Sequence, residues 1–198
     1  MNDIKRRDFI KQSAAASAVV AAPAILRGQN LNSKIGVGFI GVGNRGTKLM
    51  HRFLRNEDVY LAALCDVYQP YVDRNRGAVD ERIMASVGGK VPALDEQLGD
   101  YGKYEDFREL LADPNVDAVC IATPDHWHAV QTIQAMQAGK DVYVEKPLTI
   151  TIREGRAMVE AQKQTGRVAA VGLNRRGSTV YKHMAEQVRN GKIGQVSV

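Results

Sequence analysis

The residues best suited to chemistry form the triplet Glu145-Lys146-Pro147, which directly follows a short apolar run. A lysine at the carboxyl end of a buried strand is partly desolvated, which destabilises its ammonium form relative to the amine. Such a lysine can exchange a proton with a substrate hydroxyl near neutral pH. Glu145 would orient Lys146, and Pro147 would fix the turn that aims both. From spacing alone, Lys-Pro after a strand is more often an ordinary surface turn.

A second group of residues is suited to holding an anion. The pattern Gly41-x-Gly43-x-x-Gly46 follows an apolar segment directly. In this pattern the first glycine allows a tight turn, the second lets the backbone approach a pyrophosphate, and the third lets a helix pack closely on the sheet. The diphosphate would lie on the N-terminus of a helix that begins near Asn44, where unpaired N–H groups and the helix dipole favour an anion.

Asp66 completes this dinucleotide-binding pattern. It closes a second apolar run, 59–65, and follows Gly46 by twenty positions. Its carboxylate would accept hydrogen bonds from ribose hydroxyls at the end of the second strand. A 2′-phosphate would meet a like charge there, so we expect NAD rather than NADP. An ordinary glycine-rich turn is the alternative for the glycines taken alone.

Alternating strand and helix patterns must position these residues. Short, almost continuously apolar strands separated by helices predict a doubly wound α/β fold with a parallel sheet. Ligands bind such a sheet beyond the carboxyl ends of its strands. We expect strands at 35–40, 59–65, 118–122, 142–144 and 168–173, a short extended piece near 103–104, and helices at about 45–55, 70–86, 107–112, 127–138, 152–164 and 179–189.

These segments resemble the glucose-fructose oxidoreductase, inositol dehydrogenase and rhizopine-catabolism (Gfo/Idh/MocA) family of NAD(P)-dependent oxidoreductases. The resemblance covers about 34–198 and rests on an ordered set of motifs, 36–46, 65–67, 121–128, 144–148 and 171–175. It implies a Rossmann NAD(P)-binding domain at 31–174, followed at 175–198 by a connecting helix and the first strand of an α+β substrate domain. The rest of that domain would lie beyond Val198, so we expect the chain to be incomplete.

The family resemblance also implies roles for individual residues. Lys146 would be the catalytic lysine and would contact substrate, and Arg175 would bind substrate at the mouth of the site. The cofactor would be held by Gly41, Gly43, Asn44, Arg45, Gly46, Asp66, Thr123, Pro124, His128, Glu145 and Asn174.

The family implies hydride transfer between nicotinamide and a hydroxyl-bearing carbon of a sugar, cyclitol or glycoside. Two alternatives stay open: an NAD-dependent glycosidase or lyase that acts by transient oxidation and elimination, and a non-catalytic nucleotide-binding module. We expect a small carbohydrate-like substrate, no metal, and a homo-oligomer for the full-length form. His126 is ambiguous between site and solvent, whereas His51 and His183 fall in helical patterns and are expected at the surface.

The N-terminus predicts export. Lys5-Arg6-Arg7 precedes a short apolar stretch at 14–26, which resembles a twin-arginine signal. Lys5 stands where that pattern usually has Ser or Thr, so an amphipathic or disordered basic leader is the alternative. Residues 1–30 would then be signal and linker, the twin-arginine machinery a partner, and the location periplasmic or otherwise outside the cytoplasm. Much of the net charge of +5 lies in this segment, so the remainder is too weakly basic to predict nucleic-acid binding. Cys65 and Cys120 lie in apolar runs and are expected to be buried.

Overall fold

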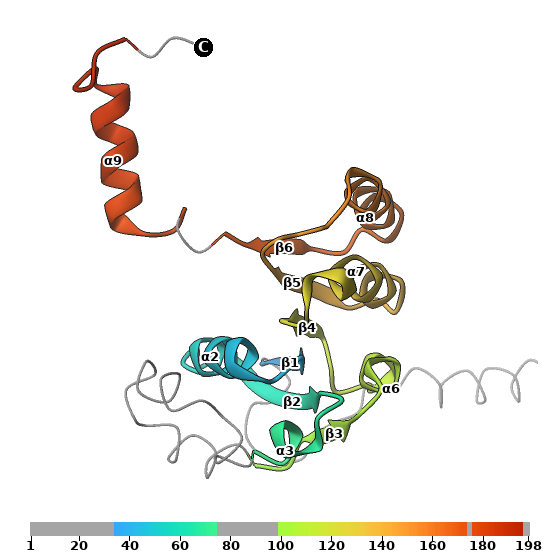
Figure 1. Ribbon diagram of the computed structural model, residues 1–198. Coiled ribbons are helices and arrows are strands. Elements are labelled where there is room, and N and C mark those ends of the chain that lie inside the picture. The colour runs from blue at the N-terminus through green and yellow to red at the C-terminus, as the bar shows by residue number, and fades with distance from the viewer. Residues whose placement is uncertain (1–33, 75–98, 174–175, 196–198) are drawn as a thin grey trace, which may run out of the picture. The chain divides into compact units, whose positions relative to one another are not determined.

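A six-stranded parallel sheet forms the centre of the protein (Figure 1). The computed structural model describes residues 34–74, 99–173 and 176–195. The strands lie in the order β3-β2-β1-β4-β5-β6, and all neighbouring pairs are parallel. This order reverses between β1 and β4, which confirms the predicted doubly wound fold. The strands are β1 (Ile35–Ile40), β2 (Val59–Cys65), β3 (Gly102–Tyr104), β4 (Ala118–Ile121), β5 (Asp141–Glu145) and β6 (Ala169–Gly172).

The register of the sheet brings the carboxyl ends of its central strands together. Ile40 at the end of β1 lies opposite Cys65 of β2 and Ile121 of β4. Ile121 in turn lies opposite Val144, and the next residue, Glu145, pairs with Gly172. The loops after β1, β2, β4 and β5 therefore leave the sheet at one edge, where the two candidate motifs meet.

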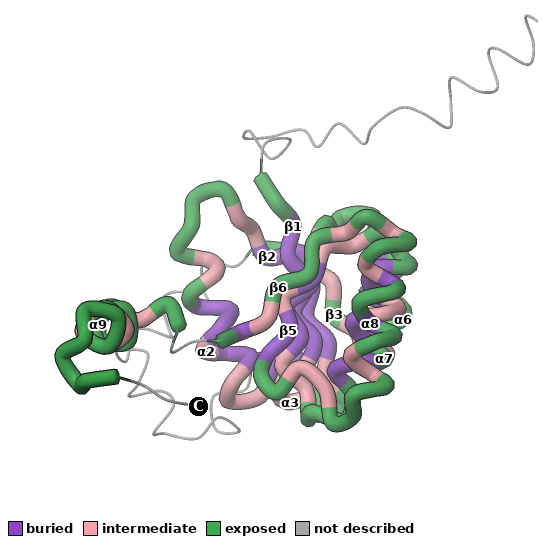
Figure 2. The backbone as a smooth tube through the Cα atoms, turned by 90° about the horizontal axis from the view of Figure 1, so that it is seen from above, coloured by how far each residue is buried: buried purple, intermediate pink, exposed green. Residues whose placement is uncertain are grey.

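Helices cover both faces of the sheet (Figure 2). Apolar residues of α2 and α3 pack with β1 and β2 on one face, and those of α6, α7 and α8 pack with β4 and β5 on the other. These two buried layers explain why the central strands are apolar on both sides. The helices are α2 (Asn44–Phe53), α3 (Gln69–Val72), α6 (Phe107–Ala112), α7 (His128–Gln137), α8 (Ile152–Thr165) and α9 (Thr179–Arg189), with a 3₁₀ turn at Asp125–Trp127.

Local signals in the sequence explain where α8 begins and ends. The Thr151 hydroxyl accepts the Glu154 N–H, and the Glu154 carboxylate accepts the Thr151 N–H, which together form a capping box. Gly166 ends the helix with φ +67°, a left-handed conformation that glycine adopts without steric cost.

Most predicted elements are present, with their ends shifted by a few residues. The predicted 127–138 helix is divided into the 3₁₀ turn and α7. Only α3 is described within the predicted 70–86 helix, since 75–98 lie outside the described residues. The signal at 1–30 also lies outside them, as does most of the strand expected at 194–198. Residues of α9 are described, and none of them is buried.

One expectation about a histidine is wrong. His51 was expected at the surface, but only 3% of it is exposed. It lies in α2, next to the buried Met50, and this part of the helix packs inward. His183 is exposed, as expected. Within 34–74, 99–173 and 176–195 we find no helix long and apolar enough to cross a membrane.

Candidate functional site

The glycine loop between β1 and α2 makes two close backbone contacts that require glycine. Gly41 has φ +81°, and a Cβ there would lie 2.7 Å from the Thr123 nitrogen on the loop after β4. A Cβ on Gly46 would lie 1.9 Å from the Gly41 carbonyl oxygen. Any side chain would therefore push α2 away from the sheet. The loop has the shape that its glycine spacing predicts.

The N-terminus of α2 is suited to an anion. The helix begins at Asn44, as predicted, and its N-cap Gly43 provides no capping side chain. The first turn contains no acidic residue, so no carboxylate opposes a phosphate at the positive end of the helix dipole. A glycine cradle and a helix end without a side-chain cap together fit a pyrophosphate. Tyr71 borders the loop, since a Cβ on Gly43 would lie 2.9 Å from the Tyr71 ring.

Asp66 connects the end of β2 to the glycine loop. Its Oδ2 accepts the Val42 N–H at 2.8 Å, and its Oδ1 accepts the Tyr68 N–H at 3.0 Å. The carboxylate therefore fixes the backbone between Gly41 and Gly43. Each oxygen keeps a further lone pair, so hydrogen bonding to a ribose stays compatible with this geometry. The ribose role itself stays a prediction.

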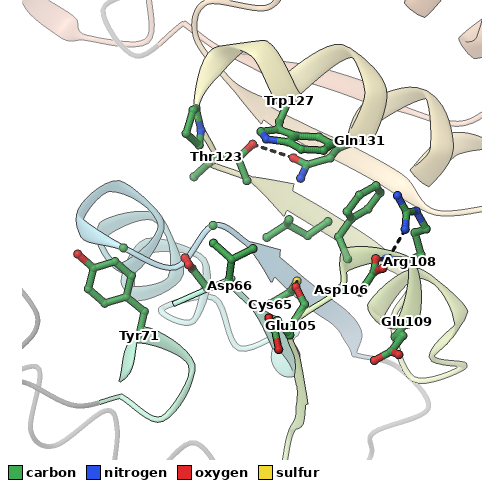
Figure 3. A pocket seen from close by; sticks show the side chains of 17 residues that line it. Cys65, Asp66, Tyr71, Glu105, Asp106, Arg108, Glu109, Thr123, Trp127 and Gln131 are labelled. Carbon is green, nitrogen blue, oxygen red and sulfur yellow. Dashed lines mark hydrogen bonds and ion pairs between the residues drawn. The ribbon is translucent and has the colours of Figure 1, made fainter. Parts of the chain in front are cut away.

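A pocket of about 810 Å³ lies over the carboxyl ends of β1, β2 and β4 (Figure 3). This volume lies in the usual range for cofactor sites. In the view of Figure 3, Asp66 lies between Tyr71 and Asp106, and Trp127 and Gln131 lie above. Among the described residues that line the pocket, four carboxylates face one guanidinium. The carboxylates belong to Asp66, Glu105, Asp106 and Glu109, and the guanidinium belongs to Arg108.

The acidic segment after β3 is held by its own contacts. Asp106 is the N-cap of α6 and accepts the Arg108 N–H at 2.8 Å. The Arg108 guanidinium bonds to the other Asp106 oxygen at 2.9 Å. Arg108 is thus already paired with a carboxylate, and the lining contributed by residues 34–74 and 99–173 retains an excess of negative charge.

Cys65 lines the same pocket but is not a nucleophile. Burial and then the charge of Asp66 raise the pKa of its thiol to about 12. Burial also raises the pKa of Cys120. Since the thiolate is the reactive form, both cysteines are structural.

A second pocket of about 370 Å³ lies beside the first and contains the Glu-Lys-Pro triplet. Arg45, from the first turn of α2, forms an ion pair with Glu145 at the end of β5. Glu145 is 4% exposed, so this pair is largely shielded from water on the carboxylate side. The pKa of Tyr143 is raised, first by burial of its hydroxyl and second by the negative charge of Glu145. The ion pair joins the glycine loop to the segment that carries Lys146.

Lys146 itself is exposed at the mouth of this second pocket. Its backbone N–H donates to Glu145 Oε2 at 3.2 Å. We expected this lysine to be partly desolvated, but the described residues leave it exposed. The loop that carries it lies beyond the carboxyl end of β5, where the sheet and its helices do not cover it. A bound cofactor and substrate would have to provide the desolvation.

Thr123 and His128 follow β4 and make contacts inside the protein. The Thr123 hydroxyl donates to Gln131 Oε1 at 2.7 Å. His128 is 1% exposed, and its two ring nitrogens lie 2.7 Å from the Pro147 carbonyl oxygen and 2.9 Å from that of Thr123. It lines the second pocket, yet both nitrogens are engaged by backbone. His126 lies in the 3₁₀ turn and is exposed.

The structure thus brings together most of the predicted site residues at one sheet edge. Asn174 and Arg175 lie outside the described residues. Sequence reasoning missed the pocket residues Tyr71, Glu105, Trp127 and Gln131. For Glu105 there was a signal: it directly follows the predicted 103–104 strand, whose carboxyl end had to reach the same edge. Among the described residues, no group of three histidine, cysteine, aspartate or glutamate side chains is arranged to hold a metal.

Residues 35–173 match the family model described as "Oxidoreductase family, NAD-binding Rossmann fold" (GFO_IDH_MocA). A protein of Shewanella baltica named "Glycosyl hydrolase family 109 protein" is 30% identical over 216 residues, which cover 99% of this chain and 45% of that protein.

Two solved structures are also similar. A probable dehydrogenase from Thermotoga maritima has a TM-score of 0.63 and 32% identity, over 81% of this chain and 42% of that chain. Apo scyllo-inositol dehydrogenase from Lactobacillus casei has a TM-score of 0.65 and 25% identity, over 82% of this chain and 43% of that one. The chain thus spans less than half the length of the relatives it matches.

Proposed function

This chain belongs to the Gfo/Idh/MocA family of oxidoreductases with an NAD-binding Rossmann fold, and we propose that it oxidises a hydroxyl group of a sugar, cyclitol or glycoside with NAD. The observation that carries the proposal is the pairing of Arg45 with Glu145, because it places the candidate catalytic segment directly against the glycine loop. A dinucleotide seated on the loop would then reach Lys146. The similarity to a scyllo-inositol dehydrogenase supports a polyol substrate.

The residues of this chain have separable roles in the proposed reaction. The first pocket would hold the adenosine half of the cofactor against Asp66, and the N-terminus of α2 would hold the diphosphate. Bound NAD would supply the hydride acceptor. Lys146 would take the hydroxyl proton while the carbon loses a hydride and the C–O bond becomes a carbonyl. Glu145 would hold the Lys146 backbone, and Arg45 would hold Glu145.

The charge of the first pocket supports NAD over NADP. A 2′-phosphate would enter a space lined by Asp66 and by three further carboxylates after β3, and among the described residues of that lining Arg108 is the one guanidinium. Asp106 already pairs with this arginine. The negative charges of these carboxylates would repel a 2′-phosphate, whereas the ribose hydroxyls of NAD can donate hydrogen bonds to carboxylate oxygens.

An absorbance assay tests the proposal. The protein is mixed with NAD and a panel of inositols, hexoses and glycosides, and NADH formation is followed. Accumulation of NADH with one of these substrates would support the dehydrogenase. NAD binding by calorimetry, without any turnover over the panel or over oxidised counterparts with NADH, would instead support a nucleotide-binding module.

The named Shewanella relative favours a second candidate function. A glycoside hydrolase of this kind would oxidise the substrate transiently with NAD, eliminate the glycosidic group, add water across the resulting double bond, and return the hydride. Release of free sugar from a glycoside with no net NADH would support this reading. Both reactions begin with loss of a hydroxyl proton, so Lys146 fits either of them, and the net formation of NADH separates the two.

A further inference from the structure

Gln131, in the first turn of α7, is a buried polar residue that lines the first pocket. It is 4% exposed, and its Oε1 accepts a hydrogen bond from the Thr123 hydroxyl at 2.7 Å. Within 34–74, 99–173 and 176–195, its amide nitrogen donates to no other group. A carboxamide has two N–H donors, and a buried donor without an acceptor costs free energy. A ligand of the pocket that presents an acceptor here therefore gains affinity.

The bond from Thr123 orients this carboxamide. Thr123 lies on the loop after β4, and its hydroxyl is directed at the oxygen of the amide. Because the oxygen is turned toward Thr123, the nitrogen is turned away from it. Figure 3 shows the side chain of Gln131 pointing into the pocket, on the side where Asp66 lies below it. The two donors are thus fixed toward the pocket before a ligand binds.

The lining near this amide suits a flat, uncharged ring. Trp127 is 41% exposed and meets the edge of the Phe107 ring, with the ring centroids 6.2 Å apart, and both residues line the pocket. Ile40, Ala122 and Pro124 add further apolar lining. The carboxylates of the same lining disfavour an anionic group at this place. A pocket with apolar walls and a few oriented polar groups is typical of sites that bind a heteroaromatic ring.

We propose that Gln131 binds the adenine of the dinucleotide: its amide N–H donates to a ring nitrogen of the base, and Thr123 holds the carboxamide in that orientation. Adenine is neutral, flat and has acceptor nitrogens in its ring, so it matches both the donors and the apolar lining. The inference deepens the function proposed above and rests on it. The glycine loop and Asp66 would hold diphosphate and ribose, which many nucleotides share, whereas Gln131 makes affinity depend on the base.

Calorimetry on Gln131→Met, which keeps the length of the side chain and removes its donors, tests this contact. We expect the dissociation constants of NAD and AMP to rise about threefold to tenfold, the usual effect of losing one hydrogen bond. Nicotinamide mononucleotide, which has no adenine, should bind as it does to the unmodified protein. Gln137→Met, at an exposed position of the same helix, is the control. Unaltered AMP binding, or an equal loss for both mononucleotides, would overturn the proposal.

Deaza analogues of AMP, in each of which a C–H replaces one acceptor nitrogen of the ring, test the same bond on the unmodified protein. We expect one analogue to bind about threefold to tenfold more weakly than AMP, and Gln131→Met to bind that analogue and AMP equally. Analogues that all bind as tightly as AMP would overturn the proposal, even if the variant fails to fold. Absence of NAD binding would overturn the proposed function as well, whereas NAD binding that is insensitive to Gln131 would overturn this inference alone.

Discussion

At the scale of single residues, the candidate site depends on side chains that hold backbone rather than face solvent. Asp66 accepts two backbone N–H groups, and the His128 ring nitrogens face two backbone carbonyls. Lys146 differs, because its side chain is exposed while its own N–H is held. Because the Lys146 side chain does not hold other parts of the site, a substitution of Lys146 should abolish proton transfer and leave the structure of the site intact.

Replacing Lys146 by alanine should abolish turnover but not cofactor binding. Loss of a group that moves a proton in the reaction costs roughly 100-fold or more in kcat. The NAD dissociation constant, measured by calorimetry, should change less than about threefold, because the glycine loop and Asp66 are untouched. Lys163→Ala on the exposed part of α8 is the matched control and should leave both quantities unchanged. Near-normal turnover in Lys146→Ala would remove the lysine from the mechanism.

Replacing Asp66 by asparagine should reduce the preference for NAD. The amide retains one oxygen acceptor, but it loses a charge that would bond to ribose, a loss of about 1.5–3 kcal/mol for a hydrogen bond to a charged group. NAD should bind about tenfold or more weakly, whereas NADP binding should fall less or improve. The measurement is the ratio of the two dissociation constants, with Glu160→Gln on α8 as the control. A constant ratio would count against the ribose role.

At the scale of elements, single substitutions test two features. One is the close packing of α2 against the glycine loop, and the other is the capping box that begins α8. Gly46 lies where α2 crosses the loop, whereas Gly155 lies inside α8, and a Cβ there would meet nothing closer than 3.7 Å. The same substitution should therefore have opposite effects at the two positions.

Gly46→Ala should destabilise the protein by about 1–3 kcal/mol, the usual cost of forcing atoms into a packed site. Gly155→Ala should stabilise it by roughly 0.5–1 kcal/mol, because alanine is the better helix former. Urea denaturation measures both free energies of unfolding. Equal effects would show that the close approach at Gly46 is relieved without cost.

The capping box of α8 predicts a specific pH dependence. The pKa of Glu154 lies below its ordinary value because the backbone N–H groups of Thr151 and Ile150 donate to its carboxylate. A lowered folded pKa means that this stabilisation is present above the unfolded pKa and is lost as pH falls through the folded one. The difference in unfolding free energy between the unmodified protein and Glu154→Gln should therefore be largest near neutral pH and shrink below about pH 4. A Glu160→Gln control, farther along α8, should not reproduce this trend.

At the scale of the whole molecule, the sheet edge that collects the loops couples cofactor binding to folding. NAD that binds only the folded protein should raise the free energy of unfolding by about 2.7 kcal/mol at 100 times its dissociation constant. The same concentration of NADP should raise it less. Thermal unfolding followed by circular dichroism, with and without each nucleotide, measures the difference. Equal stabilisation by both would contradict the predicted preference.

Much of this architecture could be predicted from the sequence because local signals agree with one another. The 35–40 and 59–65 strands have the bounds expected, since glycine and aspartate end their apolar runs. The alternation of strand and helix predicted a doubly wound parallel sheet, and the observed order of the strands confirms it. The rule that parallel strands end at one edge brings the glycine loop, Asp66 and Lys146 together. The roles of Thr123, Pro124 and His128 came from the family resemblance.

What could not be predicted depends on contacts between distant segments. The bond from Val42 to Asp66, the contacts of His128 with two loops, and the pairing of Arg45 with Glu145 join residues 5 to 100 positions apart. The burial of His51 likewise follows from how α2 packs. The spacing of residues in a chain predicts which edge they reach, but the partners at that edge come from three-dimensional packing.

The two cysteines have a practical consequence for measuring the protein in solution. Cys65 and Cys120 are the only cysteines in the sequence, both are buried, and burial raises the pKa of each thiol. Maleimide reagents react with exposed thiolate and would therefore pass them by. A single cysteine introduced at an exposed position of α9, such as Lys182, would be the one labelled group. The mobility of a fluorescent or spin label on that helix could then be recorded on the otherwise unaltered sequence.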